Sequence, residues 1–260
     1  MSTSSTNSSG DEQPRDATSS SNEQPRDATY WAQQTSVFKV SGIPSGALNL
    51  NVEGRQGLSP LQGFGQMWQK IYRVRLSGVT VSPTEVIRTW KEDFPKFWPK
   101  GNRFHAPLTG IAPGEVAILR IVPGGMPLST GVMVLYADDE SFTLMTPQGH
   151  VFAGWITFSA YEDNDSTVAQ AQVLMRANDP LYEMGLRFGG HKAEDKFWVH
   201  TLTALAAHFA VEAAVETQVT CVDPKIQWSE AKNIWQNAAM RTMIYTMTAP
   251  VRWIRKRGQS

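Results

Sequence analysis

The chain of 260 residues is long enough for one ordinary domain with an apolar core, or for two small ones. Hydrophobic residues make up 41% of it and aromatic residues 10%, which is typical of a packed globular protein and excludes a fibrous or wholly disordered chain. The 24 basic and 24 acidic residues cancel, so we expect no nucleic-acid partner. The charge is nevertheless uneven, because residues 225–260 hold seven basic residues and one acidic residue, a balance of +6.

The single cysteine, Cys221, excludes an internal disulfide framework. No run approaches the roughly 18 apolar residues that a membrane-spanning helix needs. The start of the sequence has neither the basic region nor the apolar region of a secretory signal. These features predict a soluble, cytoplasmic protein.

Residues 1–36 form a Ser- and Thr-rich segment that we expect to be disordered, because it holds too few apolar residues to offset its ordering entropy. It contains a repeat, since Glu12–Thr18 recurs as Glu23–Thr29. Replication slippage in an unconstrained tail and a repeated partner-binding motif both explain the duplication.

The first regular elements are expected between residues 71 and 98. Residues 71–76 alternate apolar and basic side chains, which predicts a half-buried strand. Ser82-Pro83-Thr84-Glu85 is a capping box that opens a helix with an apolar stripe. Pro95 and Pro99 end or kink this helix.

Strands separated by turns are predicted from Gly114 onward. The predicted strands are Glu115–Val122, Thr130–Tyr136, Ser141–Thr146, Val151–Tyr161 and Thr167–Arg176. Because short turns and no helices separate them, they predict an antiparallel meander.

Helices are predicted for the rest of the chain. Asp179-Pro180 opens a helix that Gly189-Gly190 breaks. A longer helix is expected over residues 192–216, and a last helical region over residues 229–247, before Pro250.

This order of elements resembles the helix-grip fold of the START-like superfamily, which includes the birch-pollen allergen, polyketide cyclases and lipid-transfer domains. The resemblance covers about residues 67–214, with one strand fewer than the usual seven. A narrower likeness is to a poorly characterised bacterial branch with a Pro-Gly-His turn and paired glycines. The similar residues are Thr146-Pro147-Gln148-Gly149-His150, with Gln148 inserted, and Leu186-Arg187-Phe188-Gly189-Gly190.

The resemblance implies an α+β helix-grip domain over residues 37–222, in which a curved antiparallel sheet wraps around a long C-terminal helix. It also implies an apolar cavity between sheet and helix. We therefore expect binding of a hydrophobic small molecule, lipid-like or aromatic, or alternatively a cyclase- or hydratase-like reaction in the same cavity.

Seven residues are candidates for this ligand site. Methionines adapt to irregular apolar shapes, and mid-strand aromatic residues either line a cavity or fill a core. Two polar residues at strand ends are candidates to orient a ligand, or to serve as the acid–base or oxyanion-stabilising group of an enzyme. The candidates are Met133, Tyr136, Met145, Trp155 and Met175, with the polar His150 and Arg176.

Other chemistry is not indicated. No two of the five histidines have the spacing of two metal ligands on one helix face, so no metal site is expected. His191 and Asp195 are four residues apart, which suits surface electrostatics. Cys221 has no nearby histidine to activate it, and Gly63-Phe64-Gly65 precedes a strand, so it is no dinucleotide fingerprint. No cofactor is expected.

Residues 223–260 are predicted to form a basic amphipathic helical tail. Apolar residues recur at helical spacing from Met240 to Ile254, and the sequence Arg252-Trp253-Ile254-Arg255-Lys256-Arg257 follows Val251. Three interpretations remain open. The stripe docks on the domain itself, meets another protein chain, or lies at an anionic membrane surface around Trp253.

Overall fold

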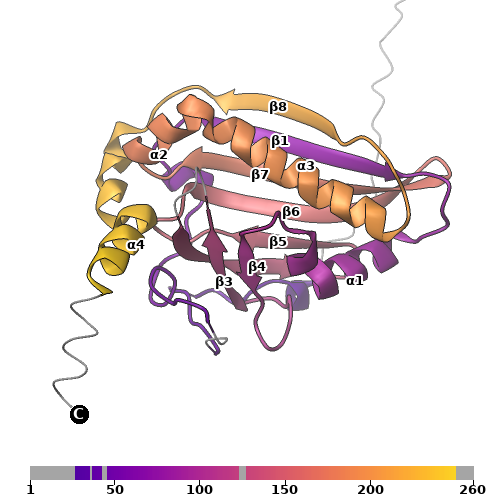
Figure 1. Cartoon of the computed structure of the whole chain (residues 1–260), viewed down its shortest axis with the longest axis horizontal. Coiled ribbons are helices and arrows are strands. Elements are labelled where there is room, and N and C mark those ends of the chain that lie inside the picture. The colour runs from indigo at the N-terminus through magenta and orange to yellow at the C-terminus, as the bar shows by residue number, and fades with distance from the viewer. Residues whose placement is uncertain (1–26, 36, 43–45, 123–126, 250–260) are drawn as a thin grey trace, which may run out of the picture.

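The computed structural model describes residues 27–35, 37–42, 46–122 and 127–249 (Figure 1). In chain order its main elements are β1 (Met67–Leu76), α1 (Pro83–Asp93), β2 (Arg103–His105), β3 (Val116–Ile121), β4 (Leu128–Ala137), β5 (Ser141–Met145), β6 (Phe152–Asp163), β7 (Ser166–Ala177), α2 (Pro180–Gly185), α3 (His191–His208), β8 (Glu216–Asp223) and α4 (Ala238–Met247). Shorter helical segments are η1 (Ala28–Tyr30), η2 (Pro60–Gln62), η3 (Phe94–Phe97), η5 (Leu186–Gly190) and η6 (Trp228–Gln236).

The eight strands form one antiparallel sheet in the order β2-β3-β4-β5-β6-β7-β1-β8. Helix α3 crosses one face of this curved sheet, and α1 lies on the same face (Figure 1). We call this the inner face and the opposite one the outer face. The arrangement confirms the α+β helix-grip fold that the resemblance implies.

Local signals explain where α1 and α2 begin and end. Ser82 Oγ accepts a hydrogen bond from the Glu85 N–H at 3.2 Å, and Pro83 occupies the first turn of α1. The helix tightens into η3 at Pro95, as the proline predicts. Asp179 caps α2 through the N–H groups of Leu181 and Tyr182.

Aromatic rings fill the space between the inner face and the two helices. Trp90 and Phe94 lie above Phe142 and Phe158, with ring centroids 5.0–6.2 Å apart. Trp198 of α3 completes the cluster at 5.5 Å from Phe158. These rings therefore occupy space in which the resemblance implies an apolar cavity.

The predicted long helix is too long at its C-terminal end. Helix α3 ends at His208, because Ala210 has a φ of 57° and the Val211 N–H reaches back to the Ala206 carbonyl at 3.0 Å. This is the hydrogen-bond pattern of a Schellman motif, here with alanine in the left-handed position. Residues 216–223, of which only Glu216 falls within the predicted helix, form strand β8 on β1.

Two further elements differ from the prediction. The short strand β2 pairs with β3 and supplies the seventh strand of the expected sheet, so β8 is an additional edge strand. The predicted helix 229–247 is divided into η6 and α4, because Asn237 leaves helical geometry and its Oδ1 caps the Met240 N–H at 3.0 Å.

The two predicted tails are only partly covered. Within residues 1–36, the described part contains η1 and Trp31, which forms a bridge to Tyr136 of β4. The first copy of the repeat lies outside the described residues, as does the stretch around Trp253.

Candidate functional site

The described residues of the segment 32–57, which are 32–35, 37–42 and 46–57, cover part of the outer face of the sheet. The Ala32 N–H donates to the Leu135 carbonyl at 2.9 Å, and Gly57 forms a bridge to Pro147. Phe38 is buried with Val52 and Met133 in a second apolar cluster, separate from the main core. The outer face of β4 is therefore covered by chain that precedes the sheet.

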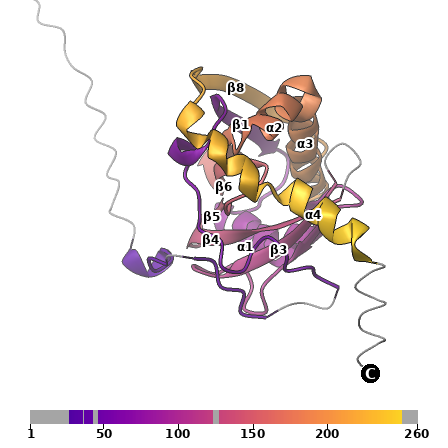
Figure 2. The same ribbon diagram turned by 90° about the vertical axis from the view of Figure 1, so that its left-hand side faces the viewer.

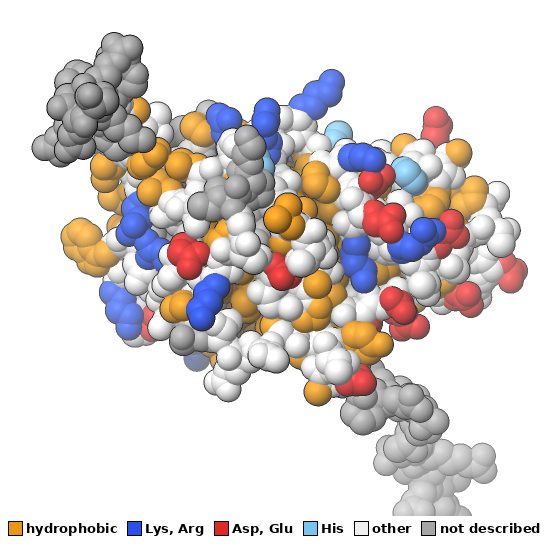
Figure 3. All heavy atoms as spheres, turned by 90° about the horizontal axis from the view of Figure 1, so that it is seen from below, with side chains coloured by type: hydrophobic (Ala, Val, Ile, Leu, Met, Phe, Trp, Pro, Cys, Tyr) orange, Lys and Arg blue, Asp and Glu red, His pale blue; other side chains and the backbone are white. Residues whose placement is uncertain are grey.

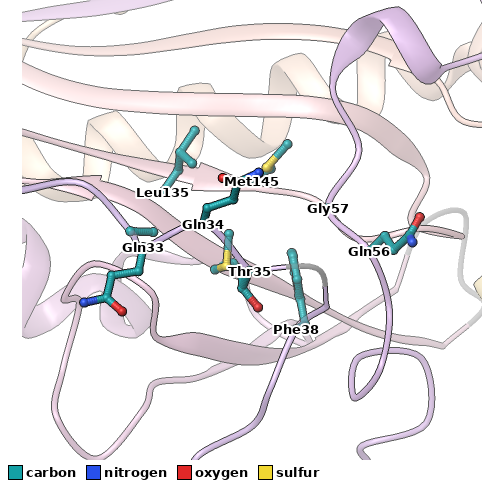
Figure 4. A pocket seen from close by; sticks show the side chains of 10 residues that line it. Gln33, Gln34, Thr35, Phe38, Gln56, Gly57, Leu135 and Met145 are labelled. Carbon is teal, nitrogen blue, oxygen red and sulfur yellow. The ribbon is translucent and has the colours of Figure 1, made fainter.

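A pocket of about 320 Å³ lies between this covering segment and the strands β4 and β5 (Figure 4). Met133 and Met145 are paired across the two strands and both line it. The complete lining is Ala32, Gln33, Gln34, Thr35, Phe38, Gln56, Gly57, Met133, Leu135 and Met145. The pocket thus has an apolar floor and an amide-bearing rim.

Tyr136 and Trp155 share this face but do not line the pocket. The register of β4 against β5 shifts between Val134 and Tyr136. The ring centroids of Trp31 and Tyr136 are 4.8 Å apart, so Trp31 packs against the Tyr136 ring. The Tyr136 hydroxyl donates to the Asp138 carboxylate. Trp155 is half-buried on β6 and pairs with Met145, one strand further along the sheet.

Met175 lies apart from the other methionines, because its side chain belongs to the main core on the inner face. The candidate residues therefore divide between the two faces. Only Met133 and Met145 are brought together in one pocket among those described.

His150 lies in the turn before β6 rather than in the strand itself. Its side chain is buried, and Nδ1 accepts a hydrogen bond from the Phe152 N–H at 3.0 Å. Burial lowers the pKa of His150 to about 4, since the charged imidazolium would lose its hydration. The imidazole is thus neutral at ordinary pH and serves to close its own turn.

Arg176 is fully buried and holds three chain segments together. Its guanidinium donates to the carbonyls of Gly65 and Lys225 and pairs with Asp223. The close approach of the segment around Gly65 to Arg176 requires glycine at position 63, because a Cβ there would lie 2.7 Å from the Arg176 Cβ. The glycines that imitate a dinucleotide motif instead let this segment lie against β7.

A polar cluster between β1 and α3 is the arrangement that the sequence analysis missed. Lys70 Nζ lies 2.9 Å from Glu194 Oε2 and 2.8 Å from Asp195 Oδ1. The Tyr72 hydroxyl donates to the same Asp195 oxygen at 2.7 Å. Lys70 is 1% exposed and Glu194 8%, so the cluster ties the long helix to the sheet from inside.

The electrostatics of this cluster are perturbed. Burial raises the pKa of Glu194 to about 7, although Lys70 opposes the shift. Burial lowers the pKa of His191 to about 4, and Lys70 adds to the effect. Burial, followed by the charge of Glu194, raises the pKa of Tyr72 above its ordinary value.

A sequence signal for the cluster existed. Lys70 lies two residues before Tyr72, in phase with the buried positions of the strand, and Asp195 is four residues after His191. The spacing alone suited a solvated pair, whereas the structure places Asp195 against a buried lysine. Within the described ranges, no three His, Cys, Asp or Glu side chains are grouped to hold a metal ion. No helix in those ranges is long and apolar enough to cross a membrane.

Comparison with known proteins gives structural similarities alone. No family model matches the sequence, and no curated protein matches it. Similar solved structures include Ara h 8.0201 (11% identity, 55% of this chain and 98% of that one, TM-score 0.41). A START superfamily protein from Mycobacterium smegmatis has 21% identity over 55% of this chain and 97% of its own, with a TM-score of 0.37. The di-domain ARO/CYC StfQ from the steffimycin biosynthetic pathway has 9% identity over 56% and 53%, with a TM-score of 0.43. The fold assignment rests on the element order and strand pairing of the chain itself.

Proposed function

We propose that this protein binds a small hydrophobic molecule in the outer-face pocket. The observation that carries the proposal is the convergence of Met133 and Met145 with Phe38 and Leu135 around about 320 Å³. This volume is at the lower end of the range of small-molecule sites. Thioether side chains adjust to ligands of different shape, which favours a compact apolar or aromatic ligand.

The rim of the pocket supplies the polar contacts that would orient such a ligand. The side chains of Gln33, Gln34 and Thr35 lie along the covering segment, and that of Gln56 lies across from them (Figure 4). Amide and hydroxyl groups donate and accept hydrogen bonds without charge. A neutral ligand with one or two polar atoms fits this lining better than an ion does.

Catalysis is not part of this proposal. His150 and Arg176, the two polar groups expected to assist a reaction, do not line this pocket. Each is engaged by backbone groups, the first with Phe152 and the second with Gly65 and Lys225. An acid–base or oxyanion-stabilising role needs such groups within reach of a bound substrate.

The proposal is tested by titrating the full chain with the fluorescent probe N-phenyl-1-naphthylamine. Leu135→Trp places a larger side chain at the half-buried pocket wall, and we expect it to weaken probe binding by about tenfold or more. Ile71→Trp is the matched control, because Ile71 is also half-buried, lies on the outer face and does not line the pocket. Equal binding by both variants and the wild type would refute the proposed site.

A further inference from the structure

One end of the molecule exposes many large apolar side chains. Figure 2 looks at this end and shows η6 and α4 running across it, with α2 beside them. Phe188 is 86% exposed, Trp235 84% and Met247 72%. We call the following residues the terminal apolar surface: Met184, Phe188, Trp228, Trp235, Met240, Met243, Ile244 and Met247.

Helix α4 presents its apolar stripe outward. Its buried positions are Ala238 and Thr242, and the Thr242 hydroxyl is held by the Asn51 amide at 3.2 Å. Met243, Ile244 and Met247 lie on the opposite side and are more than half exposed. For these described residues, the interpretation that the stripe docks on the domain itself is therefore wrong.

Several contacts hold α4 in this orientation. The Ala238 N–H donates to the Gly149 carbonyl at 2.8 Å, and the Ala239 N–H donates to the Tyr182 hydroxyl at 3.0 Å. The buried Asn237 amide donates to Asp179 Oδ2 at 2.8 Å. The exposure of the stripe is thus a consequence of how the helix is anchored to α2 and to the turn before β6.

Basic side chains accompany the terminal apolar surface. Lys225, Lys232, Arg241 and Arg187 are exposed on the same elements or next to them. The carboxylate Glu183 is buried beneath Arg187, and Glu230 is only 21% exposed beside Lys232. Figure 3 shows hydrophobic side chains gathered at this left-hand end with Lys and Arg side chains beside them.

We propose that the terminal apolar surface docks on an anionic lipid membrane. Exposed Trp, Met and Ile side chains suit the boundary between headgroups and acyl chains, and the neighbouring cations suit anionic headgroups. The balance of +6 over residues 225–260 acts in the same direction. A second copy of this chain is disfavoured as the occupant, because it would bring like charges together. This docking does not depend on the pocket, and it would place the proposed ligand-binding protein at a membrane surface.

The test is co-sedimentation of the full chain with vesicles of phosphatidylcholine, with and without phosphatidylserine. We expect binding to the anionic vesicles that weakens as salt is raised, since salt screens the basic residues. The combined variant Met243→Gln, Ile244→Gln and Met247→Gln should weaken binding by about tenfold or more, because the apolar contact is lost. Its unfolding midpoint should stay near that of the wild type, since the changed side chains are exposed.

The matched control carries Leu108→Gln and Val219→Gln, two exposed apolar residues outside this surface. We expect the control to bind vesicles like the wild type. A second variant, Lys232→Gln with Arg241→Gln, should reduce the salt dependence without changing the apolar contact. Three results would overturn the proposal: no vesicle binding at low salt, equal binding by the triple-glutamine variant, or self-association in sedimentation that the same three changes abolish.

Discussion

Replacing Lys70 with methionine tests whether the buried cluster ties α3 to the sheet. The substitution keeps an unbranched side chain of similar shape and removes the cation that lies 2.9 Å from Glu194 and 2.8 Å from Asp195. Two carboxylates are then left together without a neutralising charge. Breaking a buried pair by removing one partner costs about 3–5 kcal/mol of unfolding free energy, so we expect that loss at about pH 8.

The loss should depend on pH with a defined sign. The pKa of Glu194 is raised to about 7 in the folded protein, so this carboxyl is mostly protonated at about pH 5.5. Lys70 then has less negative charge to neutralise. The Lys70→Met loss should therefore be smaller by about 1–2 kcal/mol at about pH 5.5 than at about pH 8.

Urea unfolding followed by tryptophan fluorescence measures both values. Arg75→Met is the matched control, because its pair with Asp163 is 45% and 40% exposed, so solvent screens it and its loss should change the unfolding free energy far less than the loss of Lys70. Adding Glu194→Gln to Lys70→Met should recover part of the loss at about pH 8, since it removes one uncompensated charge. A Lys70→Met loss below about 1 kcal/mol at about pH 8, or an equal loss at both pH values, would contradict the reasoning.

Two further predictions concern His150 and the turn that contains it. The folded pKa of His150, about 4, is below the ordinary 6.5, so the unfolded chain takes up a proton first and this contribution to stability is lost as pH falls from about 6.5 to 4. Wild-type unfolding free energy should therefore fall by about 3 kcal/mol more than that of His150→Gln over this range, and equal slopes would contradict it. Gly149→Ala should unfold at a clearly lower temperature than Gly78→Ala, although both glycines have positive φ. A Cβ at Gly149 would lie 2.0 Å from the Gln236 carbonyl oxygen, whereas a Cβ at Gly78 would have nothing within 4 Å. Similar melting temperatures for the two variants would show that the α4 anchor is not held by this close approach.

The local sequence determined the meander and the starts of the first helices. The predicted strands 141–146 and 151–161 correspond to β5 (Ser141–Met145) and β6 (Phe152–Asp163). They are apolar segments limited by short turns, and their pairing satisfies the backbone hydrogen-bonding groups. Asp179 with Pro180 caps α2, and the break at Gly189 follows from its φ of 114°. These signals lie within a few residues of the element that they specify, so they can be recognised in the sequence without the tertiary structure.

The end of α3 and strand β8 depended on contacts distant in sequence. Six alanines between residues 204 and 214 favour helix, and no glycine marks its end. The helix stops because Val211 is buried in the main core and Ala210 accepts a left-handed conformation. The next residues then pair with β1, whose position the meander sets.

The face on which each candidate residue lies was decided only by the tertiary structure. Alternation along β4 indicates that Met133 and Val134 point to opposite faces, but both faces are buried because the segment around Phe38 covers the outer one. When both faces of a strand are buried, the alternation of side chains does not show which of them point to the inner face and which to the outer face. The strand pattern likewise does not show what Lys70 contacts. Its partners Glu194 and Asp195 belong to α3, which lies more than a hundred residues later in the sequence. A strand pattern fixes which residues share a face, and only the packing of distant segments fixes what that face meets.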